Sequence, residues 1–477
     1  MTISSRPEIL LAYPSCFHYP GHADQVDIRT SQLLLASYLS QFFPVTYADF
    51  EVTIGRPSTP AQIRRYERQV RHYLTDHECD ILALSCWTSL SYRATLTTAR
   101  IFRELYPDRL IVVGGYHPTA LPMEFITRDN LIDYVVCGEG ELALKEIADG
   151  WSTAGRPGET KILKAATFPE QSFVDYRWEL TDDLVREHYP EGLLNVFIYL
   201  SRGCPFGCSF CMEPLKDRKW RAFSPEESIR ILVDSVRRYD SHAVGISDAC
   251  FGMRPAWRKE FLKRLVDIEP DFWVVFETRP EYLDADDIGM LARLKTEVQF
   301  GIESGSPEML RLMKKSKQPE KFLERFAEVS NLMSDNGVLH RANLIMNHPG
   351  ETRKTLQETF AYMDRLNGRR DSCLMWACSG YMHFPGCELD SNRAYYEQAF
   401  GTKIGSPRWW QEDEDQYEAC HRSIPSDDFT EDDVNLWERM FDDRQDQLKD
   451  CLAPHAFEFA ARKYYWEWKD DARFVQA

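Results

Sequence analysis

Long uncharged apolar segments and an excess of basic residues are both missing from this sequence. No segment approaches the roughly 18 uncharged apolar residues that a transmembrane helix requires. The apolar stretch at residues 9–12 is too short for the core of a signal peptide. The 57 Lys and Arg residues are outnumbered by 75 Asp and Glu residues, a formal net charge of −18. Because nucleic-acid phosphates are bound by clustered Lys and Arg, we expect that the protein does not bind nucleic acid. Because long apolar segments are missing, we also expect a cytoplasmic protein that does not bind a membrane.

The sequence also lacks the paired Cys-x-x-Cys knuckles and the fourth nearby ligand of a structural zinc site. Three of its 13 cysteines, Cys204, Cys208 and Cys211, fall within eight residues, and the next one, Cys250, has no partner close by. Thiolates are the usual ligands of iron–sulfur clusters, and three of them leave one iron of a four-iron cluster open. The spacing therefore favours an iron–sulfur cluster over zinc. The scattered remaining cysteines are expected to be reduced, and Cys250 to be a buried structural thiol.

The pattern Cys204-x3-Cys208-x2-Cys211, with Phe210 just before the last cysteine, closely resembles the signature of radical S-adenosylmethionine (SAM) enzymes. The resemblance implies a [4Fe-4S] cluster whose open iron binds the amino and carboxylate groups of SAM. It also implies that one-electron reduction then releases a 5′-deoxyadenosyl radical, and that Phe210 packs near the adenine. Few other folds need three thiolates so close together.

Residues 8–141 alternate short apolar runs with helical patterns. Continuous apolar strands interleaved with helices predict a Rossmann-like parallel sheet with helices on both faces, and loops at the carboxyl ends of such strands bind ligands. The expected strands are residues 9–13, 81–85, 110–113 and 134–136, and the expected helices are 31–43, 60–77, 92–106 and a last one ending at residue 148.

Three loops that follow these strands resemble the cobalamin-binding domain that precedes the radical domain in one large subgroup of the family. The resemblance implies that the strand-end serine and the Gly-Gly-x-His-x-Thr loop lie along the nucleotide tail of cobalamin. The alternative is a Rossmann-like domain that is retained without its cofactor. The implied cobalamin contacts are Ser85, Trp87, Thr88, Gly114, Gly115, His117, Thr119, Gly138, Glu139 and Gly140.

One departure from cobalamin proteins concerns the ligand below cobalt. Many of them carry Asp-x-His-x-x-Gly soon after the first strand, and the loop at residues 14–21 does not match this pattern, although it contains His18. The pattern occurs instead at residues 240–245, where a strand of the second domain is expected, so we interpret that match as a coincidence. Cobalt is therefore expected to lack this histidine ligand.

Residues 194–390 resemble the radical SAM barrel. Six strand–helix units predict an open parallel barrel with its chemistry at the carboxyl ends of the strands. A helix is expected at residues 225–239, where Pro-Glu-Glu opens the first turn. The expected strands are residues 195–200, 244–248, 273–276, 298–305, 341–346 and 374–376.

Polar residues at these strand ends match the family in part. Asp248 stands where the family holds the methionine amino group, Arg279 suits the methionine carboxylate, and Glu303 with Ser304 resembles the ribose-binding Gly-x-Glu-Ser-Gly. The family norm at the first position is often a Gly-Gly-Glu or a paired acid, so Asp248 is a partial match. The alternative for each residue is a turn cap or a salt-bridge partner.

The resulting domain prediction is a Rossmann-like cobalamin-binding domain at residues 1–149, a linker at 150–193, the radical SAM barrel at 194–390 and a small, mostly helical segment at 391–477. This last segment is acidic and aromatic, with a helix expected at residues 432–450 and an aromatic run at 464–468. In the family such segments close the barrel mouth over substrate. The alternative is that its aromatics are core residues and its charges are solvated.

The function that this resemblance implies is a cobalamin-dependent radical SAM enzyme, a methyltransferase acting on an unactivated carbon of a small molecule or peptide. Its partners would be that substrate and an electron donor such as flavodoxin or ferredoxin. Alternatives are a non-methylating rearrangement or cyclisation, a methylthiotransferase-like enzyme, and a non-enzymatic cobalamin or iron–sulfur sensor. Methylthio transfer requires three more cysteine ligands, for which the N-terminal domain offers Cys16, Cys79, Cys86 and Cys137.

Overall fold

A computed structural model of the chain describes residues 6–18, 28–151, 155–190, 192–193, 195–413 and 415–456, so the aromatic run at 464–468 lies outside the described residues. The chain divides into two compact units. The first unit comprises residues 1–249, 382–393 and 405–422, and the second comprises residues 250–381, 394–404 and 423–477.

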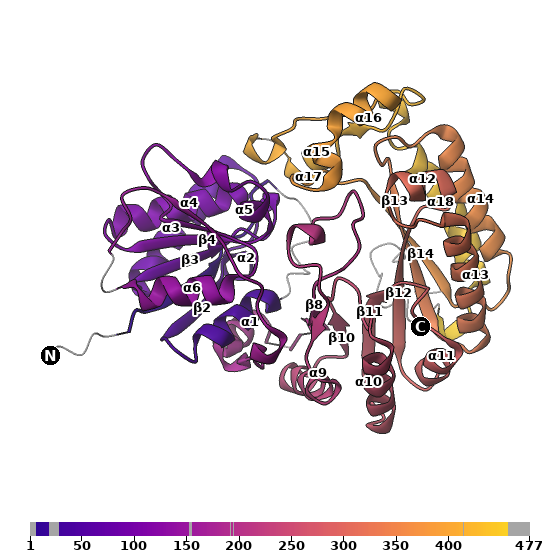
Figure 1. Cartoon of the computed structure of the whole chain (residues 1–477), viewed down its shortest axis with the longest axis horizontal. Coiled ribbons are helices and arrows are strands. Elements are labelled where there is room, and N and C mark those ends of the chain that lie inside the picture. Colours follow the sequence, from indigo (N-terminus) through magenta and orange to yellow (C-terminus); the bar gives the residue numbers. More distant parts are fainter. Residues whose placement is uncertain are drawn as a thin grey trace. The chain divides into compact units, whose positions relative to one another are not determined.

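A parallel six-stranded sheet forms the centre of the first unit (Figure 1). The strands β1, β3 and β4 are almost wholly buried apolar runs, as a parallel sheet covered on both faces requires. The predicted Rossmann-like sheet is therefore confirmed. The order is β2-β1-β3-β4-β5-β6, with β1 (Ile9–Tyr13), β2 (Val45–Asp49), β3 (Ile81–Ser85), β4 (Leu110–Gly114), β5 (Tyr134–Cys137) and β6 (Lys161–Lys164).

Helices connect these strands; α3, α4 and α6 are amphipathic, whereas α1 is buried on nearly all sides. Thr59 and Gln62 form a capping box that starts the helix at Pro60, where the fixed φ of proline suits a first turn. Contacts pair α3 with α4 and α1 with α6. The helices are α1 (Thr30–Leu39), α3 (Pro60–Asp76), α4 (Tyr92–Leu105) and α6 (Gly140–Asp149).

The cysteine loop also belongs to the first unit. Strand β7 (Asn195–Ile198) pairs in parallel with β10 (Ala243–Ile246), and α9 (Pro225–Tyr239) begins at a capping box of Ser224 and Glu227. The two-residue strands β8 (Ser201–Arg202) and β9 (Arg221–Ala222) pair antiparallel. They bring together the two ends of the loop at residues 203–220, which carries the three cysteines.

Two later segments return to the first unit and enter its core. Trp409 and Trp410, which are 0% and 2% exposed, pack in one cluster with residues of the Rossmann-like sheet and its helices. The indole nitrogen of Trp409 donates to the carbonyl of His383, and that of Trp410 donates to Glu124. These two tryptophans are therefore core residues of the first unit.

The second unit carries the remaining parallel strands. β11 (Trp273–Thr278), β12 (Thr296–Glu303), β13 (Leu339–Met346) and β14 (Leu374–Gly380) pair in this order. With β7 and β10 this makes six parallel strands of the partial barrel, so the predicted α/β fold class is confirmed. The helices of this unit include α10 (Pro255–Asp267), α11 (Ala285–Leu291), α13 (Pro319–Asp335), α14 (Arg353–Asn367) and α18 (Leu436–Cys451).

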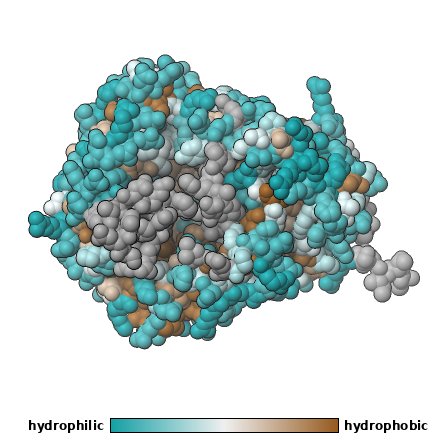
Figure 2. All heavy atoms as spheres, turned by 180° about the vertical axis from the view of Figure 1, so that it is seen from behind, coloured by the Kyte–Doolittle hydropathy of each residue, from teal (hydrophilic) through white to brown (hydrophobic). Residues whose placement is uncertain are grey.

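The surface of the described residues is largely polar. The most exposed large hydrophobic side chains are Met123 at 67% and Tyr395 at 54%, and the face shown in Figure 2 is mostly hydrophilic with small hydrophobic groups. In the part of the chain that the structure describes, no helix combines the length and apolarity needed to cross a membrane.

Candidate functional site

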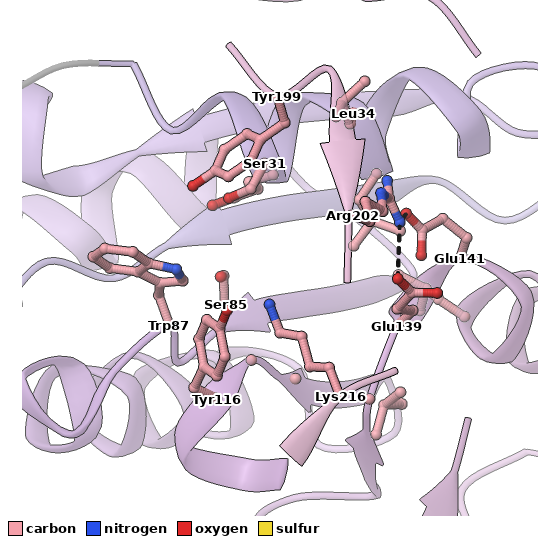
Figure 3. Close-up of a pocket in the computed structure, with 18 of the residues that line it drawn as sticks. Ser31, Leu34, Ser85, Trp87, Tyr116, Glu139, Glu141, Tyr199, Arg202 and Lys216 are labelled. Carbon is pink, nitrogen blue, oxygen red and sulfur yellow. Dashed lines mark ion pairs between the residues drawn. The ribbon is translucent and has the colours of Figure 1, made fainter. Parts of the chain in front are cut away.

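A cavity of about 350 Å³ opens at the carboxyl ends of β3, β4 and β5 in the first unit (Figure 3). This edge of an open α/β sheet is where ligands bind. Ser85 ends β3, Gly114 ends β4, and Gly138 follows β5. The opposite wall comes from the residue after β7, from β8 and from the cysteine loop. These contribute Tyr199, Ser201, Arg202, Gly203, Glu213, Lys216 and Asp217.

The inner part of the cavity is apolar. The sheet contributes side chains from four neighbouring strands, and the helices α1 and α6 contribute leucines. An apolar interior with a few polar groups at the mouth is typical of cofactor sites, because the interior binds a ring system while the polar groups fix its orientation. The apolar residues are Leu11, Leu34, Leu35, Ala83, Leu84, Val112, Val136 and Leu144.

Gly115 shapes the wall that the Rossmann-like loops provide. Its φ of 120° lies in the left-handed region, and a Cβ there would stand 2.3 Å from the carbonyl oxygen of Cys86. The backbone of Cys86 also donates to the carbonyl of Gly114 at 2.8 Å. The two loops therefore approach more closely than any side chain at this position would allow.

Seven of the ten predicted cobalamin contacts line this cavity, namely Ser85, Trp87, Gly114, Gly115, Gly138, Glu139 and Gly140. Thr88, His117 and Thr119 do not line it. The side chain of Thr119 accepts a hydrogen bond from the Gly138 amide at 2.9 Å and donates to the Gly115 carbonyl at 2.7 Å. Thr119 therefore fastens one glycine loop to the other.

His117 lies behind the cavity wall, fully buried. Its Nδ1 is 2.7 Å from the hydroxyl of Ser89, and its Nε2 is 3.4 Å from the carboxylate of Glu124. Burial lowers the pKa of His117, against the opposing effect of Glu124. Its neighbours thus hold a neutral ring within the core.

The two other histidines considered from the sequence also lie outside the cavity lining. His18 has its Nε2 3.0 Å from Asp413. His242 is exposed, and Gly245 of the same sequence pattern lies inside β10. The pattern at residues 240–245 therefore falls on a loop and a strand, away from the cavity.

A network of arginines and carboxylates forms part of the charged wall. Arg202 lies 2.6 Å from Glu141 and 3.8 Å from Glu139, and Arg221 lies 2.8 Å from Glu139. Although burial opposes it, the hydrogen bond from Arg221 and the charge of Arg202 lower the pKa of Glu139. Residues directly after β5 are thereby tied to both strands that flank the cysteine loop.

Tyr116 connects the glycine loop to the cysteine loop. Its hydroxyl donates to the carboxylate of Glu213, whose backbone amide donates to Sγ of Cys211 at 3.4 Å. The ammonium of Lys216 lies 3.5 Å from the centroid of the Tyr116 ring. Figure 3 shows the amine of Lys216 pointing into the cavity beside this ring.

Several lining residues were missed by the sequence reasoning. Three of them lie near the cysteine motif without being part of it: Arg202, Glu213 and Lys216. Two others, Ser31 and Gln32, line the cavity from the start of α1. A cavity wall assembled from segments far apart in the chain leaves no local pattern. The one available signal was the clustering of charges on both sides of the three cysteines.

The three cysteines lie on one loop and influence one another. Burial raises the pKa of the Cys211 thiol to about 12; the Glu213 amide opposes this shift, and the Glu213 carboxylate with Cys208 and Cys204 adds to it. Among the described residues, no group of His, Cys, Asp and Glu side chains is already gathered as a metal site. The donor set, three neighbouring thiols whose mutual repulsion a cation would relieve, suits an iron–sulfur cluster.

Asp248, predicted to bind the SAM amino group, is buried and already engaged. Its Oδ1 accepts the backbone amides of Leu200 and Ser201 at 2.8 and 2.9 Å, and its Oδ2 accepts the Ser201 hydroxyl at 2.6 Å. Burial raises its pKa to about 7, against the opposing effect of these hydrogen bonds. Asp248 thus anchors the entry to the cysteine loop, and its oxygens retain further lone pairs.

The predicted SAM residues of the second unit also have partners there. Arg279 donates to Glu281 at 2.8 Å and to the carbonyl of Lys315 at 3.0 Å. Ser304 lies 2.9 Å from the hydroxyl of Thr359. Glu303, at a φ of 68°, accepts from Lys315 at 2.8 Å. Lys315 is a further residue that the sequence reasoning missed.

Gly301 provides space for a group of charges in the second unit. A Cβ on Gly301 would stand 2.5 Å from Glu303 Oε1, 2.9 Å from Lys315 Nζ and 3.1 Å from Glu277 Oε1. Burial raises the pKa of Glu277, and the nearby Glu303 adds to this shift, while Lys315 opposes it. Two carboxylates thus lie near the ammonium of Lys315, and the charge of Arg341 also opposes the shift in the pKa of Glu277.

Comparison with known proteins finds two domain families, one in the N-terminal part of the chain and one after it. A model described as B12 binding domain matches residues 32–148, and a model described as Radical SAM superfamily matches residues 198–363. The chain is 26% identical over 309 residues, 60% of its length, to an uncharacterized methyltransferase, PH0819, of Pyrococcus horikoshii. It is 28% identical over 239 residues, 48% of its length, to the ribosomal protein uS12 methylthiotransferase RimO of Thermosipho melanesiensis.

A third relative is the cobalamin-dependent radical SAM methyltransferase TokK of Streptomyces tokunonensis, 29% identical over 196 residues, 37% of this chain. The matches span 64% of PH0819, 54% of RimO and 28% of TokK, so the chain covers less than two thirds of each of these relatives.

Among solved structures, the chain is similar to the radical SAM methyltransferase TsrM of Kitasatospora setae with cobalamin and a [4Fe-4S] cluster bound. The TM-score is 0.65 at 17% identity, over 94% of this chain and 91% of that one. At this identity the likeness establishes the fold. The two model matches show that the chain contains a B12-binding domain followed by a radical SAM domain, and these domains together imply cobalamin, a [4Fe-4S] cluster and SAM as cofactors.

Proposed function

We propose that this chain is a cobalamin-dependent radical SAM methyltransferase that adds a methyl group to an unactivated carbon of a small molecule or peptide. The observation that carries the proposal is the cavity of the first unit. Loops of the B12-binding domain form one of its walls, and residues next to the cysteine loop form the other. Cobalamin in this cavity would lie beside the loop that holds the cluster.

The residues divide by cofactor. Cobalamin would be held by the apolar interior of the cavity, by the glycine loops, and by Ser85, Trp87 and Glu139. Cys204, Cys208 and Cys211 would hold the cluster. When bound, cobalamin supplies the methyl group, and the cluster with SAM supplies the one-electron chemistry. SAM would be contacted by Phe210, Asp248, Arg279, Glu303 and Ser304.

The work of the chain is then to bind, to orient and to exclude water. Hydrogen bonds from Leu200 and Ser201 to Asp248 fix the start of the cysteine loop. The ion pairs of Arg202 and Arg221 with carboxylates that follow β5 fix the opposite cavity wall. The proposal includes an electron donor such as flavodoxin or ferredoxin and a cytoplasmic location.

The test uses the full-length protein, purified and reconstituted without oxygen. We expect about four irons per chain, one bound cobalamin, and cleavage of SAM to 5′-deoxyadenosine that is lost in Cys208→Ala. With candidate substrates, mass spectrometry should find products heavier by one methylene. Iron and cobalamin without SAM cleavage would overturn the proposal in favour of a sensor. SAM cleavage with a product of unchanged methyl content would favour rearrangement or cyclisation.

Methylthio transfer is a second candidate because RimO is among the relatives. It needs a second cluster, with its ligands in the N-terminal domain. Cys79 lies before β3 and Cys86 after it, so roughly 20 Å of extended chain separates them. Cys16, Cys79 and Cys86 are all buried, and their thiol pKa values are each raised to about 12 by burial. An iron content of about eight per chain would support this alternative.

A further inference from the structure

Lys216 is the cation of the cavity that lacks an acidic partner. All cavity-lining residues belong to the part of the chain that the structure describes, and Lys216 forms no ion pair within it. Its one close contact is the face of the Tyr116 ring, 3.5 Å from the ammonium. The amine points into the cavity, as Figure 3 shows.

The neighbouring acids are engaged elsewhere. Glu139 and Glu141 pair with Arg202 and Arg221, and Arg221 also lies 3.5 Å from Asp217. Glu213 accepts the hydroxyl of Tyr116. Lys216 is therefore the cation of this wall that has no ion pair among the described residues; burial lowers its pKa, and the charge of Glu213, which lies beyond ion-pair distance, opposes this shift. A buried unpaired ammonium is costly until an anion arrives.

Gln32 gives an independent sign of a ligand. It lines the same cavity and is 4% exposed, and neither its amide nitrogen nor its amide oxygen has a hydrogen-bond partner among the residues that the structure describes. Buried amides are almost always satisfied, so an unpaired amide on a residue that lines a cavity points to a bound molecule with polar groups. Cobalamin carries several side-chain amides and one permanent anion, the phosphodiester of its nucleotide tail.

We propose that the ammonium of Lys216 binds the phosphodiester of the cobalamin nucleotide tail. This inference rests on the proposed cobalamin site. A lysine is a point charge suited to a phosphate, and Lys216 comes from the loop that carries the cysteines. The cysteine loop would thereby take part in recognising the tail of the cofactor, and cobalamin binding would stabilise this loop.

The test is a matrix of three ligands against four proteins, measured as Kd from absorbance titrations without SAM. Cobalamin contains the phosphate and the base, cobinamide phosphate contains the phosphate without the base, and cobinamide contains neither. The proteins are wild type, Lys216→Gln, Lys216→Arg and the control Lys219→Gln, at an exposed lysine of the same loop. No substrate turnover is needed.

We expect Lys216→Gln to weaken cobalamin and cobinamide phosphate by about tenfold or more, as for a lost hydrogen bond to a charged group. Cobinamide should bind about equally to all four proteins, which also shows that the Lys216→Gln protein is folded. Lys216→Arg should restore most of the lost affinity. High salt should reduce the difference between the phosphate-containing ligands and cobinamide.

Other outcomes overturn the inference. Equal weakening of all three ligands would make Lys216 a structural residue. An unchanged affinity of Lys216→Gln for all three corrinoids would exclude Lys216 from the cobalamin site. Competition by inorganic phosphate without an effect of Lys216→Gln on cobalamin would assign it to free phosphate. If wild type binds none of the three corrinoids, the proposed function itself fails.

Discussion

The two walls of the cavity differ in how they are built. The wall from the Rossmann-like loops is shaped mainly by backbone: Gly115 lets two of its loops approach closely, and its acids Glu139 and Glu141 are paired with arginines. The wall from the cysteine-loop side is made of charge, with Arg202, Glu213 and Lys216 held by pairings over long sequence separations. The first wall provides shape, whereas the second provides electrostatic selectivity.

This difference predicts how each wall fails. A backbone wall tolerates no added atom, because interiors are close-packed and carbonyl groups cannot move aside. A charged wall fails when one partner of a buried pair is removed and the other is left uncompensated. An unpaired charge in the same wall should be removable without harm to the free protein. Four substitutions separate these cases, and all are measured by urea unfolding of the reduced protein without cofactors.

The largest effect is expected for Gly115→Ala. The new Cβ would stand 2.3 Å from the Cys86 carbonyl, at a φ of 120° that other residues rarely adopt. Strain and overpacking together should lower the free energy of unfolding by about 4 kcal/mol. Cobalamin per purified chain, read from absorbance, should fall with it. The control Gly158→Ala meets nothing within 4 Å, and equal losses in both variants would contradict the backbone account.

The next largest loss in the free energy of unfolding is expected for Arg202→Met. It leaves Glu141, whose side chain is 4% exposed, without its partner at 2.6 Å. Breaking a buried ion pair on one side costs about 3 kcal/mol. Adding Glu141→Gln should recover part of the loss, which a double-mutant cycle measures. The matched control is Arg186→Met, an exposed pair with Asp183, where a loss as large as that at Arg202 would rule out burial as the cause.

The pH dependence of stability tests Asp248. Its pKa is raised to about 7 in the folded chain by burial and is near 3.9 when unfolded. Between these values the folded state binds more protons, so this group's contribution to stability falls as pH rises from about 4 to about 7. Asp248→Asn removes the titrating group, so the margin between the stability of this variant and that of wild type should shift in favour of the variant as pH rises over this interval. A constant margin would show that Asp248 does not titrate there.

Sequence reasoning succeeded where a local pattern carries the structure. The apolar runs at residues 9–13 and 81–85 are β1 and β3, and residues 225–239 are α9. The strands β2 and β6 were missed because Val-Thr-Tyr-Ala-Asp and Lys-Ile-Leu-Lys mix polar with apolar residues. In the sheet order, β2 and β6 are the two edge strands. An edge strand is less enclosed than a central one, so its sequence need not be a continuous apolar run.

The site was predicted unevenly for the same reason. Glycines at strand ends mark the backbone wall, so most of its residues were found from the sequence. Arg202 pairs with Glu141, and Lys216 lies over the ring of Tyr116. Both partners lie far away in the chain, so no local pattern marks either residue. Trp409 and Trp410 resembled a substrate-closing segment by composition, yet long-range packing buries them in the core of the first unit. Such pairings follow from the fold and are absent from any short window.

The smallest effect on stability is expected for Lys216→Met, the same change of wall charge as Arg202→Met. Lys216 has no ion pair to lose, and removing an unpaired cation from a cavity relieves a desolvation cost. The free energy of unfolding without cofactor should therefore stay within about 0.5 kcal/mol of wild type or rise slightly. At the same excess concentration of cobalamin, the wild-type protein should gain more stability than the variant, since the stabilisation grows with the logarithm of the ligand concentration divided by Kd. A loss like that of Arg202→Met in the free protein would show that Lys216 supports the wall itself, and the contrast between paired and unpaired charge would disappear.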